Sequence, residues 1–176
     1  SQAASLVPEG ELTPPEALTI QAEVVNAEPD FAHNLQLVNV QAAEVLFGVV
    51  LTQLIQPGAK VVLKPDTDVF DMTTTQCTYG SPEQNLGKVA MAQLARFYKI
   101  PIYSLGGGVE GKVPDAETAA EAMMSMLLNG LAGINLNQSL GSMAFGLYGS
   151  QEQVVICDEI VRQIKHVLRG IIVDDE

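Results

Sequence analysis

Carboxylate, amide and aromatic side chains follow the ends of several short apolar segments in this sequence. Asp66 and Asp71 come after the apolar segment 61–63, and Tyr103 lies within the segment 100–105. Aromatic faces with nearby carboxylates are the groups that bind a quaternary ammonium ion. We therefore predict a binding site for a cationic amine, formed by Glu23, Asp66, Asp71, Tyr79, Tyr103, Gln138 and Phe145. The alternative for Tyr103 and Phe145 is an ordinary place in the core.

Three consecutive glycines, Gly106, Gly107 and Gly108, follow the apolar segment that contains Tyr103. Backbone N–H groups of such strand-to-helix loops can bind a phosphate, which makes the three glycines candidate cofactor-binding residues. The loop lacks the Gly-Lys-Ser/Thr ending of a P-loop. The alternative is a sharp turn that lets a bulky ligand approach the backbone.

The sequence shows no arrangement for hydrolysis or for a bound metal. His166 lies in the polar final turn of a predicted helix, and His33 has no Ser, Cys or acidic partner at a recognisable spacing. Cys77 and Cys157 do not have the spacing of metal ligands and are expected to be reduced thiols.

Apolar periodicity indicates the elements that must position these residues. Four strand-helix units are predicted to begin near residues 18, 60, 100 and 132. The predicted helices cover about 40–56, 81–97, 115–129 and 151–169, and Ser81 and Ser150 each begin a capping box. The expected buried faces are Val40, Ala43, Leu46, Phe47, Val50, Leu51 and Leu54 in the first helix, Leu86, Val89, Ala90, Leu94 and Phe97 in the second, and Val154, Cys157, Ile160, Val161, Ile164, Val167 and Leu168 in the last.

Repeated strand-helix units predict an α/β fold with parallel strands and crossover helices. Four units make either half of a TIM barrel or a small open sheet. Half a barrel would have two unpaired edges and an uncovered inner face, so we expect such a chain to self-associate or to bind a complementary barrel half. The predicted organisation is a mobile arm at 1–16 and a single β/α domain at 17–176.

Composition restricts the classes of partner. The 176-residue chain is 47% hydrophobic with a formal net charge of −12, and this acidity argues against binding to nucleic acid. No uninterrupted apolar run approaches the ~18 residues of a membrane span, and the start does not resemble a signal peptide. We therefore expect a cytoplasmic protein with no membrane partner.

A series of short segments resembles the trimethylamine methyltransferase family, called MttB, which includes glycine betaine relatives. The series covers about residues 40–176 and consists of Ala43-Glu44-Val45-Leu46, Gln53 through Pro57-Gly58-Ala59, Asp71-Met72, Tyr79 to Glu83, Val113 to Ala116, Asn129 to Gly133, Ser150 to Gln153, Asp158-Glu159 and Leu168 to Ile171.

The resemblance implies a TIM barrel that moves a methyl group from a methylated amine to a corrinoid carried on a separate protein. Positioning and water exclusion matter more in that chemistry than a strong general base. Family members are much longer, so the chain resembles the carboxyl-terminal half of the barrel. Three hypotheses remain: an amine methyltransferase or its barrel half, a non-catalytic fragment that self-associates or binds a partner, and a β/α enzyme for a phosphorylated ligand.

Overall fold

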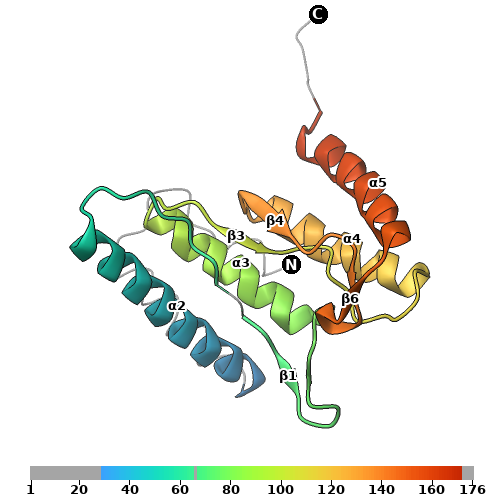
Figure 1. Cartoon of the computed structure of the whole chain (residues 1–176), viewed down its shortest axis with the longest axis horizontal. Helices are drawn as coiled ribbons and strands as arrows, with labels where there is room; N and C mark the ends of the chain where they lie inside the picture. The colour runs from blue at the N-terminus through green and yellow to red at the C-terminus, as the bar shows by residue number, and fades with distance from the viewer. Residues whose placement is uncertain (1–28, 66, 172–176) are drawn as a thin grey trace, which may run out of the picture.

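The computed structural model describes residues 29–65 and 67–171, with side chains from Val38 onward. The predicted strand near residue 18, the arm at 1–16, Glu23 and Asp66 lie outside these residues. The described part is a mixed α/β structure with the helices α2 (Pro29–Ile55), α3 (Pro82–Phe97), α4 (Ala116–Leu131) and α5 (Gln151–Leu168). In Figure 1, α2 runs beside α3, and α5 lies against α4.

Three parallel segments connect these helices. Strand β3 (Tyr103–Leu105) pairs in parallel with β4 (Leu136–Gln138), so that Tyr103 is opposite Leu136 and Leu105 is opposite Gln138. On the other side of β3, Leu63 forms a parallel bridge with Ile102. The prediction of parallel strands joined by helices is confirmed for these three segments.

The helices cover one face of the parallel segments. Leu63, Ile102 and Ile134 pack with Met91 and Ala92 of α3 in one core cluster. A second cluster joins α4 to α5, and it includes Met126, Cys157 and Ile160. Because side chains alternate along a strand, Tyr103 and Leu136 point to the opposite face, which we call the inner face. Leu136 is exposed there.

The predicted helix starts are confirmed in part. The Ser81 Oγ accepts the Gln84 N–H and the Ser150 Oγ accepts the Gln153 N–H, both at 3.2 Å. The glutamine side chains do not complete capping boxes. Gln84 Nε2 donates to Asp68 and Gln153 Nε2 donates to the Thr118 carbonyl, because both glutamines are buried against neighbouring segments.

The predicted buried face of the first helix is wrong. Val40, Phe47 and Leu54 are 58%, 69% and 77% exposed, whereas Val38 is buried and Val45 packs beside it. Periodicity did locate the helix, which extends to Pro29. It could not select the face, because apolar residues occur around most of this helix and only contact with α3 decides which of them are covered.

The predicted buried face of α3 is confirmed only in part, since Ala90 and Leu94 pack against the core cluster. Leu86 is 51% exposed, and the buried side chains are Gln84, Asn85, Lys88, Met91, Ala92 and Ala95. The first turns of α3 face the polar segment that follows Leu63, and Gln84 bonds Asp68 of that segment. Within α3, Lys88 Nζ donates to Gln84 Oε1 at 2.8 Å. In α5 the centre of the predicted stripe, Cys157, Ile160 and Ile164, is buried, but Val154, Val167 and Leu168 are exposed.

Two short hairpins lie outside the predicted strands and helices. Strands β1 (Phe70–Asp71) and β2 (Gln76–Cys77) pair before α3. Strands β5 (Ser142–Met143) and β6 (Tyr148–Gly149) pair before α5 and flank the turn η2 (Ala144–Gly146). Two-residue strands carry too little alternation to be found from sequence.

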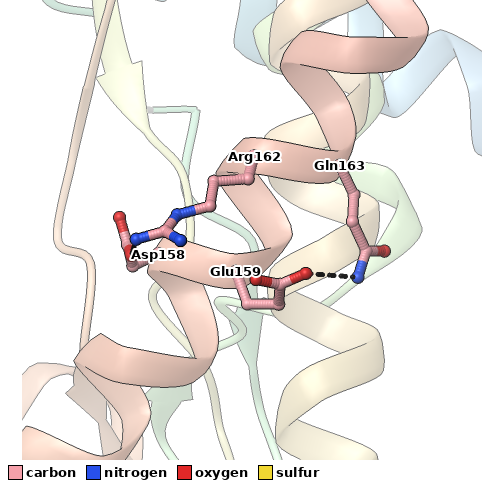
Figure 2. Close-up of polar contacts among 4 residues, drawn as sticks. All are labelled: Asp158, Glu159, Arg162 and Gln163. Atoms are coloured by element: carbon pink, nitrogen blue, oxygen red, sulfur yellow. Dashed lines mark hydrogen bonds and ion pairs between the residues drawn. The ribbon is translucent and has the colours of Figure 1, made fainter.

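The outer face of α5 is polar. Figure 2 shows Asp158 and Arg162, whose ion pair is 2.7 Å long, beside Glu159 and Gln163, whose hydrogen bond is 3.2 Å long. Such exposed pairs contribute little to stability. By length and composition one described helical segment, Val38–Ile55, could cross a membrane, with a mean hydropathy of 1.6; a test of this kind is weak evidence for one helix.

Candidate functional site

Three loops, at 78–81, 106–112 and 139–148, meet where the parallel segments end. The Val109 N–H, in the loop after β3, donates to the Ser142 carbonyl at 3.0 Å, and the Phe145 N–H donates to the Val109 carbonyl at 3.3 Å. The Ala144 N–H bonds the Gly111 carbonyl at 3.1 Å. Ligands of parallel β/α proteins bind at this end of the strands. These contacts therefore define the candidate site.

Tyr79 belongs to the loop 78–81, and its ring lies between the loops 106–112 and 139–148. A Cβ added to Gly108 would lie 3.4 Å from the ring of Tyr79, and one added to Gly146 would lie 3.2 Å from its hydroxyl oxygen. Gly146 also has a φ of 86°, which favours glycine. Tyr79 is half-buried, so the structure places a predicted aromatic wall at the loop junction.

Phe145 belongs to the same junction and has an unusual backbone. It is half-buried in η2 with a φ of 60°, a left-handed conformation that is uncommon for a residue other than glycine. Strain of this kind persists where the surroundings fix it, and the bond to Val109 is one such constraint.

The three glycines form a buried turn. The Gly106 N–H donates to the Gln138 carbonyl at 3.0 Å, and the Gly107 N–H donates to the Ser125 hydroxyl at 3.0 Å. Because these two N–H groups are used within the protein, the geometry favours a close-approach turn over a phosphate cradle. A cofactor-binding role for Gly106, Gly107 and Gly108 stays a prediction.

Two carboxylates that were not predicted as site residues connect the loop 106–112 to the loop 78–81. Glu121 Oε2, on α4, accepts the Glu110 N–H at 2.8 Å, and Glu110 Oε1 accepts the Gly80 N–H at 3.1 Å. Burial raises the pKa of Glu121, as do the charges of Glu110 and Glu117, while the bond from Glu110 acts in the opposite direction. Their proximity in space, rather than a motif, makes them notable.

Asp71 lies away from this junction, at the end of β1 where the chain turns toward β2. Its carboxylate accepts the Thr73 N–H at 2.9 Å and the Thr74 hydroxyl at 2.6 Å. These bonds lower the pKa of Asp71, and the bond from the Thr74 hydroxyl has the largest effect. The contacts describe a turn-forming aspartate, and its role in binding an amine stays a prediction.

Tyr103 and Gln138 lie on the inner face of the parallel segments. Lys64 Nζ is 6.0 Å from the centre of the Tyr103 ring, so a cation of the protein already lies near that ring. Gln138 ends β4 opposite Leu105. The structure thus brings Tyr79, Phe145 and Gln138 to one end of the strands, while Glu23 and Asp66 lie outside the described residues.

A hollow of about 380 Å³ opens at the other end of the parallel segments, lined by Ala95, Arg96, Lys99, Ile102, Gly133 and Asn135. Arg96 Nη2 donates to the Ala132 carbonyl at 2.7 Å there. This end of a β/α fold serves stability rather than chemistry, so we do not place the site in the hollow. No group of three potential metal ligands occurs within residues 38–65 and 67–171.

Comparison with known proteins decides the family. The family described as trimethylamine methyltransferase (MTTB) matches residues 35–176, which include all three site loops. The chain belongs to this family. Trimethylamine methyltransferase MttB of Methanosarcina barkeri is 42% identical over 134 residues. Glycine betaine methyltransferase of Desulfitobacterium hafniense is 35% identical over 139 residues.

The chain spans less than a third of the length of these relatives. The alignment with the M. barkeri protein covers 76% of this chain and 27% of the relative. The alignment with the glycine betaine enzyme covers 78% and 29%. The family match therefore applies to residues 35–176 of this chain.

Proposed function

We propose that this chain contributes to transfer of a methyl group from a methylated amine, such as trimethylamine or glycine betaine, to a corrinoid carried on a partner protein. The observation that carries the proposal is the family match, whose range includes the loops at 78–81, 106–112 and 139–148. The names of the relatives supply the two amines to be tested.

The chain's own residues would bind and orient the amine. Tyr79 and Phe145 present aromatic surface at the loop junction, and Glu121 holds the glycine loop through Glu110. Transfer breaks a C–N bond, and the amine leaves with the bonding electron pair. Water exclusion and alignment favour this step without a general base.

The inner face is compatible with the approach of a large planar group. Leu136 is exposed there, opposite the half-buried Tyr103. A bound corrinoid would supply the methyl acceptor. The proposed place of these segments is one part of a TIM barrel, whose inner face the rest of the barrel would enclose.

Isothermal titration with trimethylamine and with glycine betaine tests amine binding directly. We expect sub-millimolar binding of one amine, reduced at least tenfold by Tyr79→Ala and unchanged by Phe70→Ala in the exposed β1 strand. Reduced free cobalamin then serves as methyl acceptor, followed by its visible absorbance. A folded chain that binds neither amine would overturn the proposal of a working site.

A second candidate function is a non-catalytic unit that binds a complementary barrel half or another copy. The exposure of Leu136 on the inner face and of Phe47 on α2 favours it. Amine binding by the isolated chain would count against it. A cytoplasmic location remains an expectation from the sequence.

A further inference from the structure

A buried polar network lies where the first two turns of α3 pack against the segment that follows Leu63. Gln84, Asn85 and Lys88 of the helix and Thr67 of the segment are all buried, and Lys88 is only 2% exposed. Lysine is almost never buried to this extent unless its charge has partners. Lys88 Nζ donates to Gln84 Oε1 at 2.8 Å and to Asn85 Oδ1 at 3.3 Å. The protein thus holds an ammonium group in its interior despite the cost of removing it from water.

The network ends at an exposed carboxylate, that of Asp68. Gln84 Nε2 donates to Asp68 Oδ1 at 2.7 Å, and among the described residues this is the one hydrogen bond that the Asp68 side chain accepts. Lysine only donates and a carboxylate only accepts, so the partners on its two sides fix the orientation of the Gln84 amide. The buried pair Lys88 and Gln84 therefore holds Oδ1 of Asp68 and leaves Oδ2 available to a ligand.

A glycine allows the segment to approach α3 this closely. A Cβ added to Gly87 would lie 2.7 Å from Thr67 Oγ1, closer than side chains pack in proteins. Thr67 Oγ1 also donates to the Gln84 carbonyl at 3.5 Å. The close approach at Thr67 brings the next residue, Asp68, within reach of the Gln84 side chain.

Asp68 adjoins the loop that carries Tyr79. The Val69 carbonyl accepts the Thr78 N–H at 2.8 Å, so the chain at 68–69 runs beside the start of the loop 78–81. Burial raises the pKa of the Cys77 thiol, and the charge of Asp68 raises it further, as expected for a carboxylate close to the residue that precedes this loop. The network thus places a carboxylate next to one of the three site loops.

From these contacts we infer that Asp68 is the residue that binds the ammonium group of the amine substrate, and that Gln84 and Lys88 are the residues that position it. The inference rests on the proposed function and names the charged partner of the amine. A carboxylate near an aromatic ring suits an alkylammonium ion, and Tyr79 supplies the ring. Asp71, which was predicted for this role, uses both carboxylate oxygens within its own turn.

A protonated tertiary amine suits Asp68 better than a betaine does. Trimethylammonium has an N–H that donates to a carboxylate oxygen, whereas the quaternary nitrogen of glycine betaine has none. Hydrogen bonds between two charged groups are about twice as strong as those between neutral groups. The carboxylate of glycine betaine would in addition meet the negative charges of Asp68 and of Glu110, which is bonded to the loop 78–81. Asp68 therefore favours trimethylammonium.

Isothermal titration of the full chain with trimethylammonium chloride and with glycine betaine tests the role of Asp68. Asp68→Asn keeps the shape of the exposed side chain and removes its charge, so trimethylammonium binding should weaken by about tenfold and betaine binding by less. Glu83→Gln is the matched control, because it removes one charge at the exposed start of the same helix, and it should change neither affinity. Unchanged trimethylammonium binding in Asp68→Asn, or an equal loss for both amines, would overturn the inference.

Gln84→Met and Lys88→Met test the positioning of Asp68. Each variant keeps the carboxylate and removes one bond that holds it, so each should weaken trimethylammonium binding by about threefold and reduce the preference over betaine. Circular dichroism shows whether each variant is folded. If Lys88→Met does not fold, Gln84→Met tests the same connection. Wild-type affinities in the folded variants would show that the network serves stability alone.

The outcomes separate this inference from the proposed function. Reduced binding in Asp68→Asn, together with a wild type that transfers no methyl group to reduced cobalamin, would support the role of Asp68 and overturn the proposed transfer. A wild type that binds neither amine would overturn both.

Discussion

Glu121 and Glu110 are joined by a 2.8 Å hydrogen bond from the backbone N–H of Glu110 to the carboxylate of Glu121. The bond ties the loop after β3 to helix α4, and the Glu110 side chain continues the connection to Gly80. Through this chain of bonds Glu121 connects α4 to two of the three site loops.

Replacing Glu121 with Gln should change how stability depends on pH. Burial raises the pKa of Glu121 above its ordinary value of 4.5, so the folded protein binds this proton more tightly than the unfolded chain. Stability from this group is therefore complete below pH 4.5 and is lost as pH rises through the raised pKa. Chemical unfolding between pH 4 and 7 should show this loss in the wild type and not in Glu121→Gln.

Glu117→Gln, one turn earlier on the same helix, should keep the loss of stability but move it to lower pH, because the charge of Glu117 raises the pKa of Glu121. Hydrogen exchange adds a second measurement: Glu121→Ala should accelerate exchange of the Glu110 amide, which loses its acceptor. Equal exchange rates in wild type and variant would show that Glu121 does not hold the loop.

Gly106→Ala should destabilise the fold by about 1–3 kcal/mol, the cost of buried polar groups that lose their partners. A Cβ at Gly106 would lie 2.5 Å from Asn137 Oδ1 and 2.7 Å from Asn129 Nδ2. It would displace Asn129 from its bonds to the Leu105 carbonyl and to Asn137. Urea unfolding measures the change, and an unaltered midpoint would contradict the packing at this glycine.

Gly149→Ala is the control for that substitution. The nearest atom to a Cβ there is the Gly141 carbonyl oxygen at 3.7 Å, an ordinary contact distance. Its effect on the free energy of unfolding should stay within about 0.5 kcal/mol.

The corrected buried face of α3 can be tested with one pair of variants. Met91 is fully buried, so Met91→Ala should cost about 2–5 kcal/mol through lost burial and the cavity that remains. Leu86→Ala, at an exposed position of the same helix, should cost about 0.5 kcal/mol. A larger loss at Leu86 than at Met91 in denaturant titration would restore the face predicted from sequence.

Ser150→Ala should destabilise the protein by about 1 kcal/mol, because the Ser150 hydroxyl satisfies the Gln153 N–H at the start of α5. Ser150→Thr keeps a capping hydroxyl and should recover most of the loss. Thermal unfolding compares the three proteins. Similar melting temperatures for all of them would show that the cap contributes nothing measurable.

Local signals in the sequence determined the starts of α3, α4 and α5 and the alternation of helices with the parallel segments. Ser81 and Ser150 act as caps because their hydroxyls bond N–H groups only three residues away. The parallel pairing of β3 with β4 also followed from the strand-helix alternation, since a helix between two strands returns the chain in the same direction. Features of this kind can be predicted because they depend only on residues that are close together in the sequence.

Only the tertiary structure decided which faces are buried and which residues meet. Phe47 and Val38 are both hydrophobic, so the sequence does not show which of them is buried. Packing of α2 against α3 buries Val38 and leaves Phe47 exposed. Glu110 and Glu121 are eleven residues apart and share no motif, yet the bends at 112–115 that lead into α4 bring them together. Burial and long-range contact depend on how whole elements pack, and periodicity within one element does not contain that information.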